Sequence, residues 1–231
     1  MSLDLETEFD FRFERKYEIT DLPPEEIEAY VLRCPAFFRE AFPPRYINNI
    51  YLDTESLENY FQNVSGVANR TKVRVRWYGD LLGEVAKPVL EYKIKRGLLG
   101  TKDFHRLAGF TLEEGFDFDD LKEVFDRSQL DGSVRNELDL VRPTLLNRYH
   151  RKYFISADKE YRITIDTQLE FYRVGRFGNS FISRRTLEGS TILELKYAGE
   201  IAELDDSIAN FFPFRVTRMS KYVVGVELVE G

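Results

Sequence analysis

Cysteine and long apolar runs are both scarce in this chain. It has 231 residues but a single cysteine, Cys34, which excludes an internal disulfide framework and a cysteine-based zinc site. Cys34 is expected to fill the apolar face of a helix. No apolar run approaches the roughly 18 residues that a membrane-spanning helix needs. The acidic opening segment, MSLDLETEFDF, is unlike a signal peptide.

The chain also shows no linker, no repeat of fixed period and no low-complexity tract. We therefore expect residues 1–231 to form a single domain of a soluble, cytoplasmic protein. The net charge of −7 argues against a general nucleic-acid binder, although it leaves room for a local basic site. Aromatic residues make up 14% of the chain, which favours β structure.

Several common catalytic motifs are absent. GLLGTK at 97–102 and GRFGNS at 175–180 lack the spacing of a phosphate-binding P-loop, so both are predicted to be turns. There is no G-x-S-x-G or H-E-x-x-H motif. The only histidines are His105 and His150. His150 lies next to Arg151 but alternates to the opposite face of its predicted strand, so a structural role is expected.

Alternation of polar and apolar residues is the main structural signal. It predicts strands at 11–19, 45–53, 71–78, 89–96, 147–155, 161–168, 180–186 and 190–197. Helices are predicted at 24–33, 55–63, 117–128 and 200–211, whereas SKYVVGVELV at 220–229 fits either a helix or a strand. Many alternating strands with few helices indicate an antiparallel α+β protein, and a closed barrel is one form of it.

The polar faces of these strands share one property, which is an excess of positive charge. In KVRVRWY at 72–78, Lys72, Arg74 and Arg76 lie on one face and Val73 and Val75 on the other. The corresponding faces of the other strands, together with SKY near the C-terminus, bring the set to eleven cations and five acids. They are Arg12, Lys16, Lys72, Arg74, Arg76, Lys93, Lys95, Arg151, Arg162, Lys196 and Lys221, with Glu14, Glu18, Glu91, Asp166 and Glu194.

This set has a formal charge of +6, which leaves −13 for the rest of the chain. A solvated sheet face is the ordinary explanation for one such strand, but solvated faces usually mix charges to limit repulsion. If the charged faces point inward, the sheet encloses a basic tunnel whose outer, apolar face is covered by helices. Arginine and lysine there would bind a compact polyanion, and the acids would hold a divalent metal.

The same segments resemble a known family. They are RFERKYEI at 12–19, NNIYLDT at 48–54, KVRVRWYG at 72–79, LEYKIKRG at 90–97, RYHRKYF at 148–154, RITIDT at 162–167, ILELKY at 192–197 and SKYVVGVE at 220–227. In this order they are similar to the VTC domain, the polyphosphate-polymerase branch of the triphosphate tunnel metalloenzymes (the CYTH-like superfamily). The resemblance implies a closed antiparallel barrel of about eight strands, with a basic interior and helices packed outside.

The resemblance also implies an activity. In the polymerase branch, the terminal phosphate of ATP or another nucleoside triphosphate is transferred to polyphosphate, with Mn²⁺ or Mg²⁺ required. Pyrophosphate, triphosphate or phosphate can start the chain. The positions that match the family's phosphate-binding residues are Lys16, Arg74, Arg76, Lys93, Lys95, Arg151, Arg162 and Lys221, and Glu194 matches its metal-binding glutamate.

The inward-facing pattern adds further candidates to this set. Arg12, Lys72 and Lys196 are predicted to contact the substrate, and Glu14 or Glu91 to share the metal with Glu194. The catalytic set is then predicted to be Arg74, Arg76, Lys93, Lys95 and Lys221. The remaining members, Lys16, Arg151 and Arg162, are predicted to bind substrate.

One departure from the superfamily bears on the choice of activity. Its first strand usually carries Glu-x-Glu-x-Lys, whereas this chain has Arg12, Glu14 and Lys16. Losing one acid weakens a two-metal hydrolase site and makes the tunnel more basic, which favours a polymerase. An inorganic triphosphatase and a polyphosphate-binding module without catalysis remain the alternatives.

Overall fold

The computed structural model describes residues 12–96, 99–175, 177–198 and 207–230. Its strands are β1 (Arg12–Ile19), β2 (Arg39–Asp53), β3 (Asn69–Tyr78), β4 (Gly83–Val85), β5 (Val89–Arg96), β6 (Leu99–Arg106), β7 (Phe110–Leu112), β8 (Arg142–Ile155), β9 (Tyr161–Arg173), β10 (Arg184–Thr186) and β11 (Thr191–Ala198). Its helices are α1 (Pro24–Arg33), α2 (Glu58–Val64), α3 (Phe118–Arg127), α4 (Gly132–Leu138), α6 (Ser207–Phe211) and α7 (Lys221–Glu230). None of these helices is long and apolar enough to cross a membrane.

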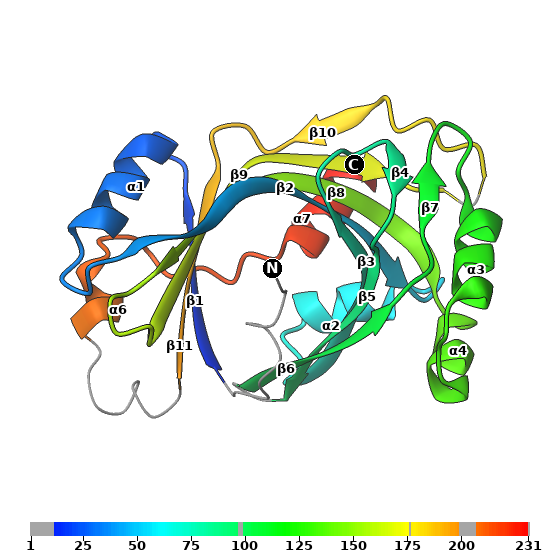
Figure 1. The fold of residues 1–231 in the computed structure, drawn as a ribbon, viewed down its shortest axis with the longest axis horizontal. Coiled ribbons are helices and arrows are strands. Elements are labelled where there is room, and N and C mark those ends of the chain that lie inside the picture. Colours follow the sequence, from blue (N-terminus) through cyan, green and yellow to red (C-terminus); the bar gives the residue numbers. More distant parts are fainter. Residues whose placement is uncertain (1–11, 97–98, 176, 199–206, 231) are drawn as a thin grey trace.

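One large antiparallel sheet dominates the structure, which confirms the expected α+β class. Its strands follow the order β1-β11-β9-β8-β2-β3-β5-β6. The sheet curls so strongly that its two edge strands, β1 and β6, come into contact, as Figure 1 shows from a view along the enclosed axis. Register shifts within the β2–β8 and β8–β9 ladders mark irregularities of the kind that bend a sheet.

Hydrogen bonding at the seam between the edge strands differs from that of a fully closed barrel. Within the described ranges, no ladder joins β1 to β6. The free edge of β1 is instead covered by the segment before α7, where Tyr17 forms an isolated bridge with Val216. The Thr217 N–H donates to the Lys16 carbonyl at 2.7 Å. The segment before α7 therefore satisfies part of an edge that would otherwise be unpaired.

Two sequence predictions about strands are corrected by the structure. The expected strand at 180–186 is reduced to β10, a short strand that pairs only with β9 and lies off the main path of the sheet. Phe181 has a left-handed backbone, with a φ of 53°, which breaks an extended run there. The expected turn at 97–102 includes the start of β6, which begins at Leu99, whereas residues 97–98 lie outside the described ranges.

The helix predictions fare better. Helices at 24–33 and 117–128 are confirmed as α1 and α3, and Asp117 caps α3 through a reciprocal capping box with Asp120. The predicted helix at 55–63 forms as α2, which begins at Glu58. Of the helix predicted at 200–211, only α6 is described, since residues 199–206 lie outside the described ranges. The ambiguous C-terminal segment is helical and forms α7.

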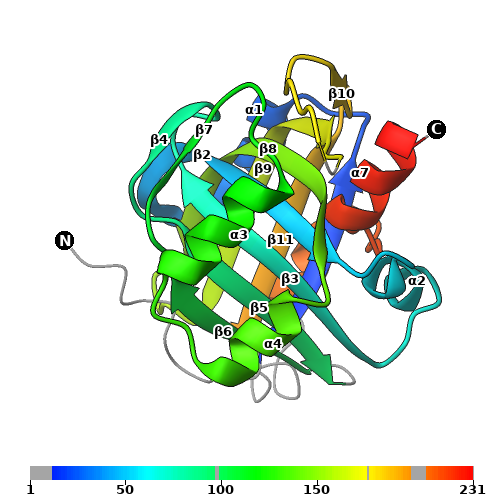
Figure 2. The ribbon, with the colours of Figure 1, turned by 90° about the vertical axis from the view of Figure 1, so that its right-hand side faces the viewer.

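The convex face of the sheet is apolar and carries most of the helices. Val75 and Trp77 of β3 pack in the cluster that contains Val124 of α3. Farther along the same convex face, Ile27 of α1 packs with outward residues of β9 and β11. Figure 2 shows α3 and α4 lying across the outer side of β3 and β5. Alternation along each strand therefore directs the charged residues to the concave face.

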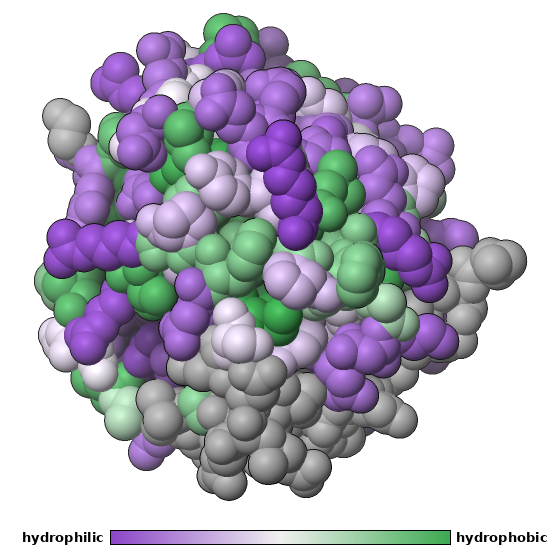
Figure 3. Space-filling model, turned by 90° about the vertical axis from the view of Figure 1, so that its left-hand side faces the viewer, coloured by the Kyte–Doolittle hydropathy of each residue, from purple (hydrophilic) through white to green (hydrophobic). Residues whose placement is uncertain are grey.

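Cys34, expected on the apolar face of a helix, lies at the C-terminal cap of α1 and packs in the core cluster beneath that helix. The surface above this cluster is not wholly polar. Figure 3 shows apolar side chains gathered in the middle of the face that carries α1 and α6. Leu32 and Phe37 near the end of α1 are 52% and 76% exposed.

The expectation that all helices pack outside is wrong for α7. Tyr222 and Val226 of this helix pack against inward-facing Leu145 and Phe171. Both ribbon views place α7 and α2 at the same end of the curled sheet (Figures 1 and 2). The inner face is apolar at this end, and exposing it to water would be costly, so a helix covers it.

Gly225 marks where α7 comes closest to the sheet. A Cβ atom at this position would lie 2.4 Å from Leu145 Cδ2 and 2.5 Å from Phe171 Cδ1. We expect Gly225→Ala to lower the free energy of unfolding by about 1–3 kcal/mol, because the helix must move or the ring must turn. Urea denaturation measures this loss.

The matched control for this substitution is Gly132→Ala in α4, where an added Cβ would meet no atom within 4 Å. It should change stability by less than about 1 kcal/mol. Equal effects of the two substitutions would show that α7 does not pack tightly on the concave face.

Candidate functional site

The charged residues predicted from alternation meet on the concave face, placed by the registers of neighbouring strands. Arg74 of β3 pairs with Glu91 of β5, and Lys72 with Lys93. Across the seam where β1 meets β6, Lys16 of β1 pairs with Glu194 of β11. The concave face therefore carries charges of both signs. Most of its cations contact carboxylates, in three separate clusters.

The first group forms around Glu91, which is 1% exposed. Its carboxylate binds Arg74, and it accepts contacts from Arg76 at 3.1 Å and Lys102 at 3.5 Å. Burial raises the pKa of the Glu91 carboxyl, but Arg74, Arg76 and Lys102 together hold this pKa well below its usual range. Glu91 is therefore ionised and holds two arginine side chains in place.

Amide side chains orient the second of these arginines. The Arg76 Nε atom donates to Asn49 Oδ1 at 2.8 Å, and Asn49 Nδ2 donates to Asn147 Oδ1 at the same distance. Asn147 Nδ2 is buried and has no hydrogen-bond partner in the structure. An unpartnered donor in such a place is available to an anionic ligand or to water.

The second group forms around Asp166 of β9, which is fully buried. Arg151 donates to both carboxylate oxygens, at 2.5 and 2.7 Å, and Lys221 of α7 lies 2.6 Å away. Burial raises the pKa of Asp166, but Arg151 and Lys221 outweigh it and lower the pKa. This contact brings a helix that closes one end of the sheet into the charged site.

The third group joins β1 and β11. Lys16 lies 2.9 Å from Glu14 and 3.3 Å from Glu194, so one ammonium bridges two carboxylates. Lys93 lies 3.1 Å from Glu14, and Lys196 lies 3.4 Å from Glu194. Burial raises the pKa of Glu14 and Glu194, but the surrounding lysines hold both well below the usual range.

The three predicted metal ligands are not equivalent in this arrangement. Within the described residues, no three acidic, histidine or cysteine side chains form a group that could hold a metal. The Glu91 carboxylate is occupied by Arg74, Arg76 and Lys102. Glu14 and Glu194 are close enough to interact with each other. Two carboxylates plus ligand oxygens suit Mg²⁺, which usually takes only one or two protein carboxylates.

The remaining predicted residues are also accounted for. Arg162 lies on β9 opposite Lys196 of β11, and both side chains are half-buried. Lys72 and Lys95 lie on the concave rows of β3 and β5. The backbone of Arg12 belongs to β1, but its side chain lies outside what the structure describes.

Sequence reasoning missed the roles of several concave residues. Lys102 belongs to a segment expected to be a turn, and only its register opposite Lys93 of β5 shows that it lies on the concave face. Asp166 was placed on the polar face but given no role. Asn49 and Asn147 carry no charge, so the pattern of charges in the sequence gives no signal for them. Only the register that places them side by side shows that they orient Arg76.

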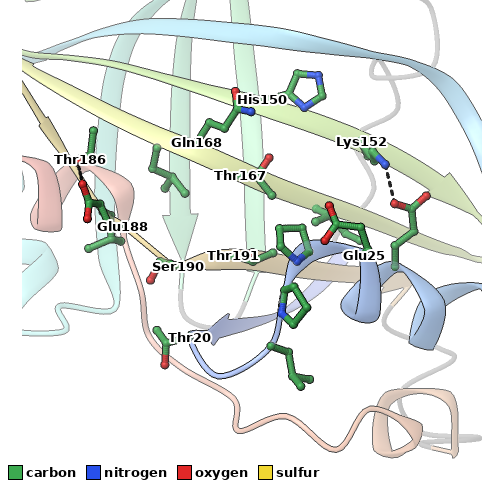
Figure 4. A pocket seen from close by; sticks show the side chains of 18 of the residues that line it. Thr20, Glu25, His150, Lys152, Thr167, Gln168, Thr186, Glu188, Ser190 and Thr191 are labelled. Atoms are coloured by element: carbon green, nitrogen blue, oxygen red, sulfur yellow. Dashed lines mark hydrogen bonds and ion pairs between the residues drawn. The ribbon is translucent and has the colours of Figure 1, made fainter.

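His150 lies on the opposite side of the sheet, as predicted. Its ring packs against Tyr46, with ring centroids 5.1 Å apart. It lines an outer hollow of about 810 Å³ between the start of α1 and the turn before β11 (Figure 4). Five acids line this hollow, which distinguishes it from the basic concave face. They are Asp21, Glu25, Glu28, Glu170 and Glu188.

Comparison with known families agrees with this geometry. The VTC domain family matches residues 11–230 of the chain. The chain belongs to the VTC domain family. Its fold is similar to the CYTH-like triphosphate tunnel fold.

Solved structures with similar folds have little sequence in common with this VTC domain. A proposed adenylate cyclase from Vibrio parahaemolyticus is 13% identical, with a TM-score of 0.52 over 93% of this chain and 98% of the other. A second one, from Bacillus halodurans, is also 13% identical, with a TM-score of 0.51 over 92% and 95% of the two chains. Such low identity supports a shared fold alone. No curated protein matches the sequence.

The buried carboxylate between Arg151 and Lys221 provides a test of how the VTC domain is held together. We expect Asp166→Asn to destabilise the protein by about 3–5 kcal/mol, because Arg151 and Lys221 lose their nearest carboxylate and keep only Glu194, at 3.9 Å from each. Thermal or urea unfolding measures the loss.

Glu170→Gln is the control for the Asp166 substitution, because Glu170 pairs with Arg184, whose side chain is 58% exposed. This substitution should cost less than about 1 kcal/mol. A small effect at both positions would mean that Asp166 is not needed to hold Arg151 and Lys221.

Proposed function

We propose that this VTC domain is a polyphosphate polymerase that transfers the terminal phosphate of ATP, or of another nucleoside triphosphate, to a growing polyphosphate chain. Residues 1–231 would form one domain whose curled sheet encloses a tunnel. The main support for this function is that the concave face combines oriented arginines and lysines with one pair of acids, Glu14 and Glu194.

The cations would bind and orient the triphosphate. Arginine forks match phosphate oxygens in two-point geometry, and Glu91 and Asn49 hold Arg74 and Arg76 in fixed positions. Pre-organised donors of this kind neutralise charge on the transferred group without the cost of reorganisation. Lys93 of β5 and Lys221 of α7 would contact further phosphate oxygens.

Phosphoryl transfer then requires little covalent help from the protein. A terminal oxygen of the acceptor phosphate forms a bond to the terminal phosphorus of the nucleotide. The bond from that phosphorus to the bridging oxygen breaks, and the nucleoside diphosphate leaves with the electron pair. The attacking oxygen is already anionic, so no strong general base is needed, in keeping with a site that contains no histidine among its described residues.

Glu14 and Glu194 would hold the divalent ion, Mn²⁺ or Mg²⁺. Such an ion would supply positive charge that offsets the charge developing on the leaving oxygen. Lys16 contacts both carboxylates and would move toward the phosphate oxygens when the ion binds there. Glu91 is better explained as the residue that orients Arg74 and Arg76.

The alternatives of the same fold are an inorganic triphosphatase and a binding module without catalysis. A triphosphatase needs a positioned water and usually a second acid on the first strand, where this chain has Arg12. A binding module has no need for two acids among its cations. Incubation of the protein with ATP, Mn²⁺ and a trace of pyrophosphate, followed on a polyphosphate gel, distinguishes the three.

A ladder of long chains on this gel supports the polymerase. Free phosphate without a ladder supports the triphosphatase. Tight triphosphate binding without turnover supports the binding module.

Glu194 should be required for turnover but not for binding. We expect Glu194→Gln to reduce polyphosphate synthesis by at least about 100-fold, since one of the two proposed metal ligands is lost. Triphosphate affinity without metal should stay the same or rise, because a negative charge is removed from the site. Gel assays and calorimetry measure the two quantities.

Glu18→Gln is the matched control for Glu194. Glu18 lies on the same face of β1 and accepts a hydrogen bond from the Ser190 hydroxyl at 3.0 Å. Its loss should leave turnover and metal dependence nearly unchanged. Unchanged turnover in Glu194→Gln would remove Glu194 from the metal site.

Triphosphate binding should be coupled to proton uptake. Glu14 raises the pKa of Lys93, but burial and Lys16 together lower it by more, and it falls to about 8. An anion bound beside Lys93 restores its pKa toward the ordinary value of about 10.4. Between these two values the bound form carries a proton that the free form lacks, so affinity falls as pH rises above about 8.

Calorimetry near pH 9 in buffers of different ionisation enthalpy measures this uptake. The observed heat should depend on the buffer, and Lys93→Met should reduce the number of protons taken up. Buffer-independent heat would contradict the coupling.

A further inference from the structure

Aromatic side chains continue the concave rows of two central arginines. On β3, Tyr78 follows Arg76 by two residues, so the two side chains share a face. On β8, Tyr153 follows Arg151 in the same way. Figure 2 shows α2 and α7 at one end of the sheet, the α2–α7 end, and β4, which follows β3, at the other. The two tyrosines therefore lie beyond the central site, in the direction away from α2 and α7.

Arg45 of β2 joins these two rings. It lies opposite Arg151 in the β2–β8 ladder, and its Cζ atom is 4.0 Å from the centre of the Tyr78 ring and 5.0 Å from that of Tyr153. Its Nε atom donates to the Tyr153 hydroxyl at 3.1 Å. Among the described residues, no carboxylate lies within ion-pair distance of Arg45, whereas Arg76 and Arg151 each contact one. The Arg45 guanidinium is thus held by aromatic rings, and its charge is left for a ligand.

A local irregularity of β2 places another ring beside this group. The register of the β2–β8 ladder shifts between Phe42 and Arg45, where the sequence reads Phe-Pro-Pro-Arg. Irregularities of this kind redirect side chains near the end of a sheet. The Phe42 ring meets the Tyr153 ring edge-on, with centroids 5.7 Å apart. Phe42 is 42% exposed, so this ring stays open to solvent and does not fill the core.

The distance from the central site suits a nucleoside. Two residues along a strand span about 7 Å, which is the step from the central arginines to the two tyrosines. A ribose linked to the first phosphate of a triphosphate covers a step of this size, which brings the base to the rings. Toward the α2–α7 end, by contrast, Tyr222 and Val226 of α7 pack against the inner face and leave less room for a base.

We propose that Phe42, Arg45 and Tyr153 form a platform on which the base of the nucleoside triphosphate stacks. This inference rests on the proposed function, and it adds where the nucleoside lies and what the site recognises in it. Aromatic rings and arginine stack on the flat face of any base, and a larger base offers more surface. The nucleobase platform should therefore favour purine over pyrimidine nucleotides, and nucleotides over inorganic triphosphate.

The experiment changes stacking without changing charge. Phe42→Ala/Arg45→Lys removes one ring and the flat guanidinium but keeps the positive charge. Phe37→Ala/Arg33→Lys makes the same two changes near the end of α1, on the outer surface, where both residues are exposed. Calorimetry at one fixed salt concentration then measures the affinity of each protein for ATP, CTP and inorganic tripolyphosphate.

We expect the platform variant to bind ATP about tenfold more weakly, with its affinity for tripolyphosphate within about twofold of the wild type. The wild type should bind ATP more tightly than CTP, and the variant should lose most of this preference. In turnover assays the KM for ATP should rise while kcat changes little, because the base is held equally in the ground state and the transition state. The control variant should match the wild type throughout.

A second measurement covers the case in which the double variant is unstable. Saturation-transfer NMR on the wild type with ATP should show transfer from the protein to the base protons H2 and H8. The single substitution Phe42→Ala should weaken this transfer, since Phe42 is partly exposed and adds little to the core.

Two results would contradict the platform. Equal losses of affinity for ATP and tripolyphosphate would make Arg45 a phosphate ligand. Unchanged ATP affinity, or no transfer to the base protons, would place the base elsewhere. Either result leaves the proposed function intact as long as the wild type binds tripolyphosphate. If the wild type binds neither ATP nor tripolyphosphate, the proposed function fails together with the platform.

Discussion

Pairing of buried cations with carboxylates is the interaction on which the rest of this structure depends. A buried charge costs several kcal/mol unless a partner of opposite sign accompanies it. Here Glu91, Asp166 and Glu194 are each 6% exposed or less and serve cations from several strands. Without them, the concave face would hold a repulsive set of arginines and lysines, and the sheet could not curl around it.

The same pairing connects the site to α7. Lys221 begins this helix and contacts Asp166, while Gly225 lets the helix pack closely on Leu145 and Phe171. An ionic contact and a close apolar contact thus fix one helix at one end of the sheet. If phosphate competes with Asp166 for Lys221, as the proposed function implies, ligand binding and the packing of α7 are linked energetically.

Much of this arrangement could be predicted from alternation alone. Runs such as KVRVRWY assign every second residue to one face, and this periodicity was enough to gather the charged set. The position of α7 could not be predicted, because a short segment such as KYVVGVELVE fits either secondary structure and its low amphipathicity hides which side it covers. The ion-pair partners of each carboxylate could not be predicted from the sequence either. Glu91 and Glu194 each precede a lysine by two residues, and only strand register shows that arginines contact Glu91 whereas lysines surround Glu194.

The balance of charge along the concave face gives a physical reason why, in the proposed reaction, the growing chain would move one way along that face. At the centre, carboxylates hold the cations in fixed geometry, so a phosphate bound there competes with protein acids and is held less strongly than the cation count suggests. Near Arg70, Lys72 and Lys95, at the start of β3 and the end of β5, no described carboxylate lies within ion-pair distance, so phosphates that move there gain more. A growing chain would therefore be drawn away from the reaction centre toward the α2–α7 end. The centre is then free for the next nucleotide, which a site of uniformly tight binding would not allow.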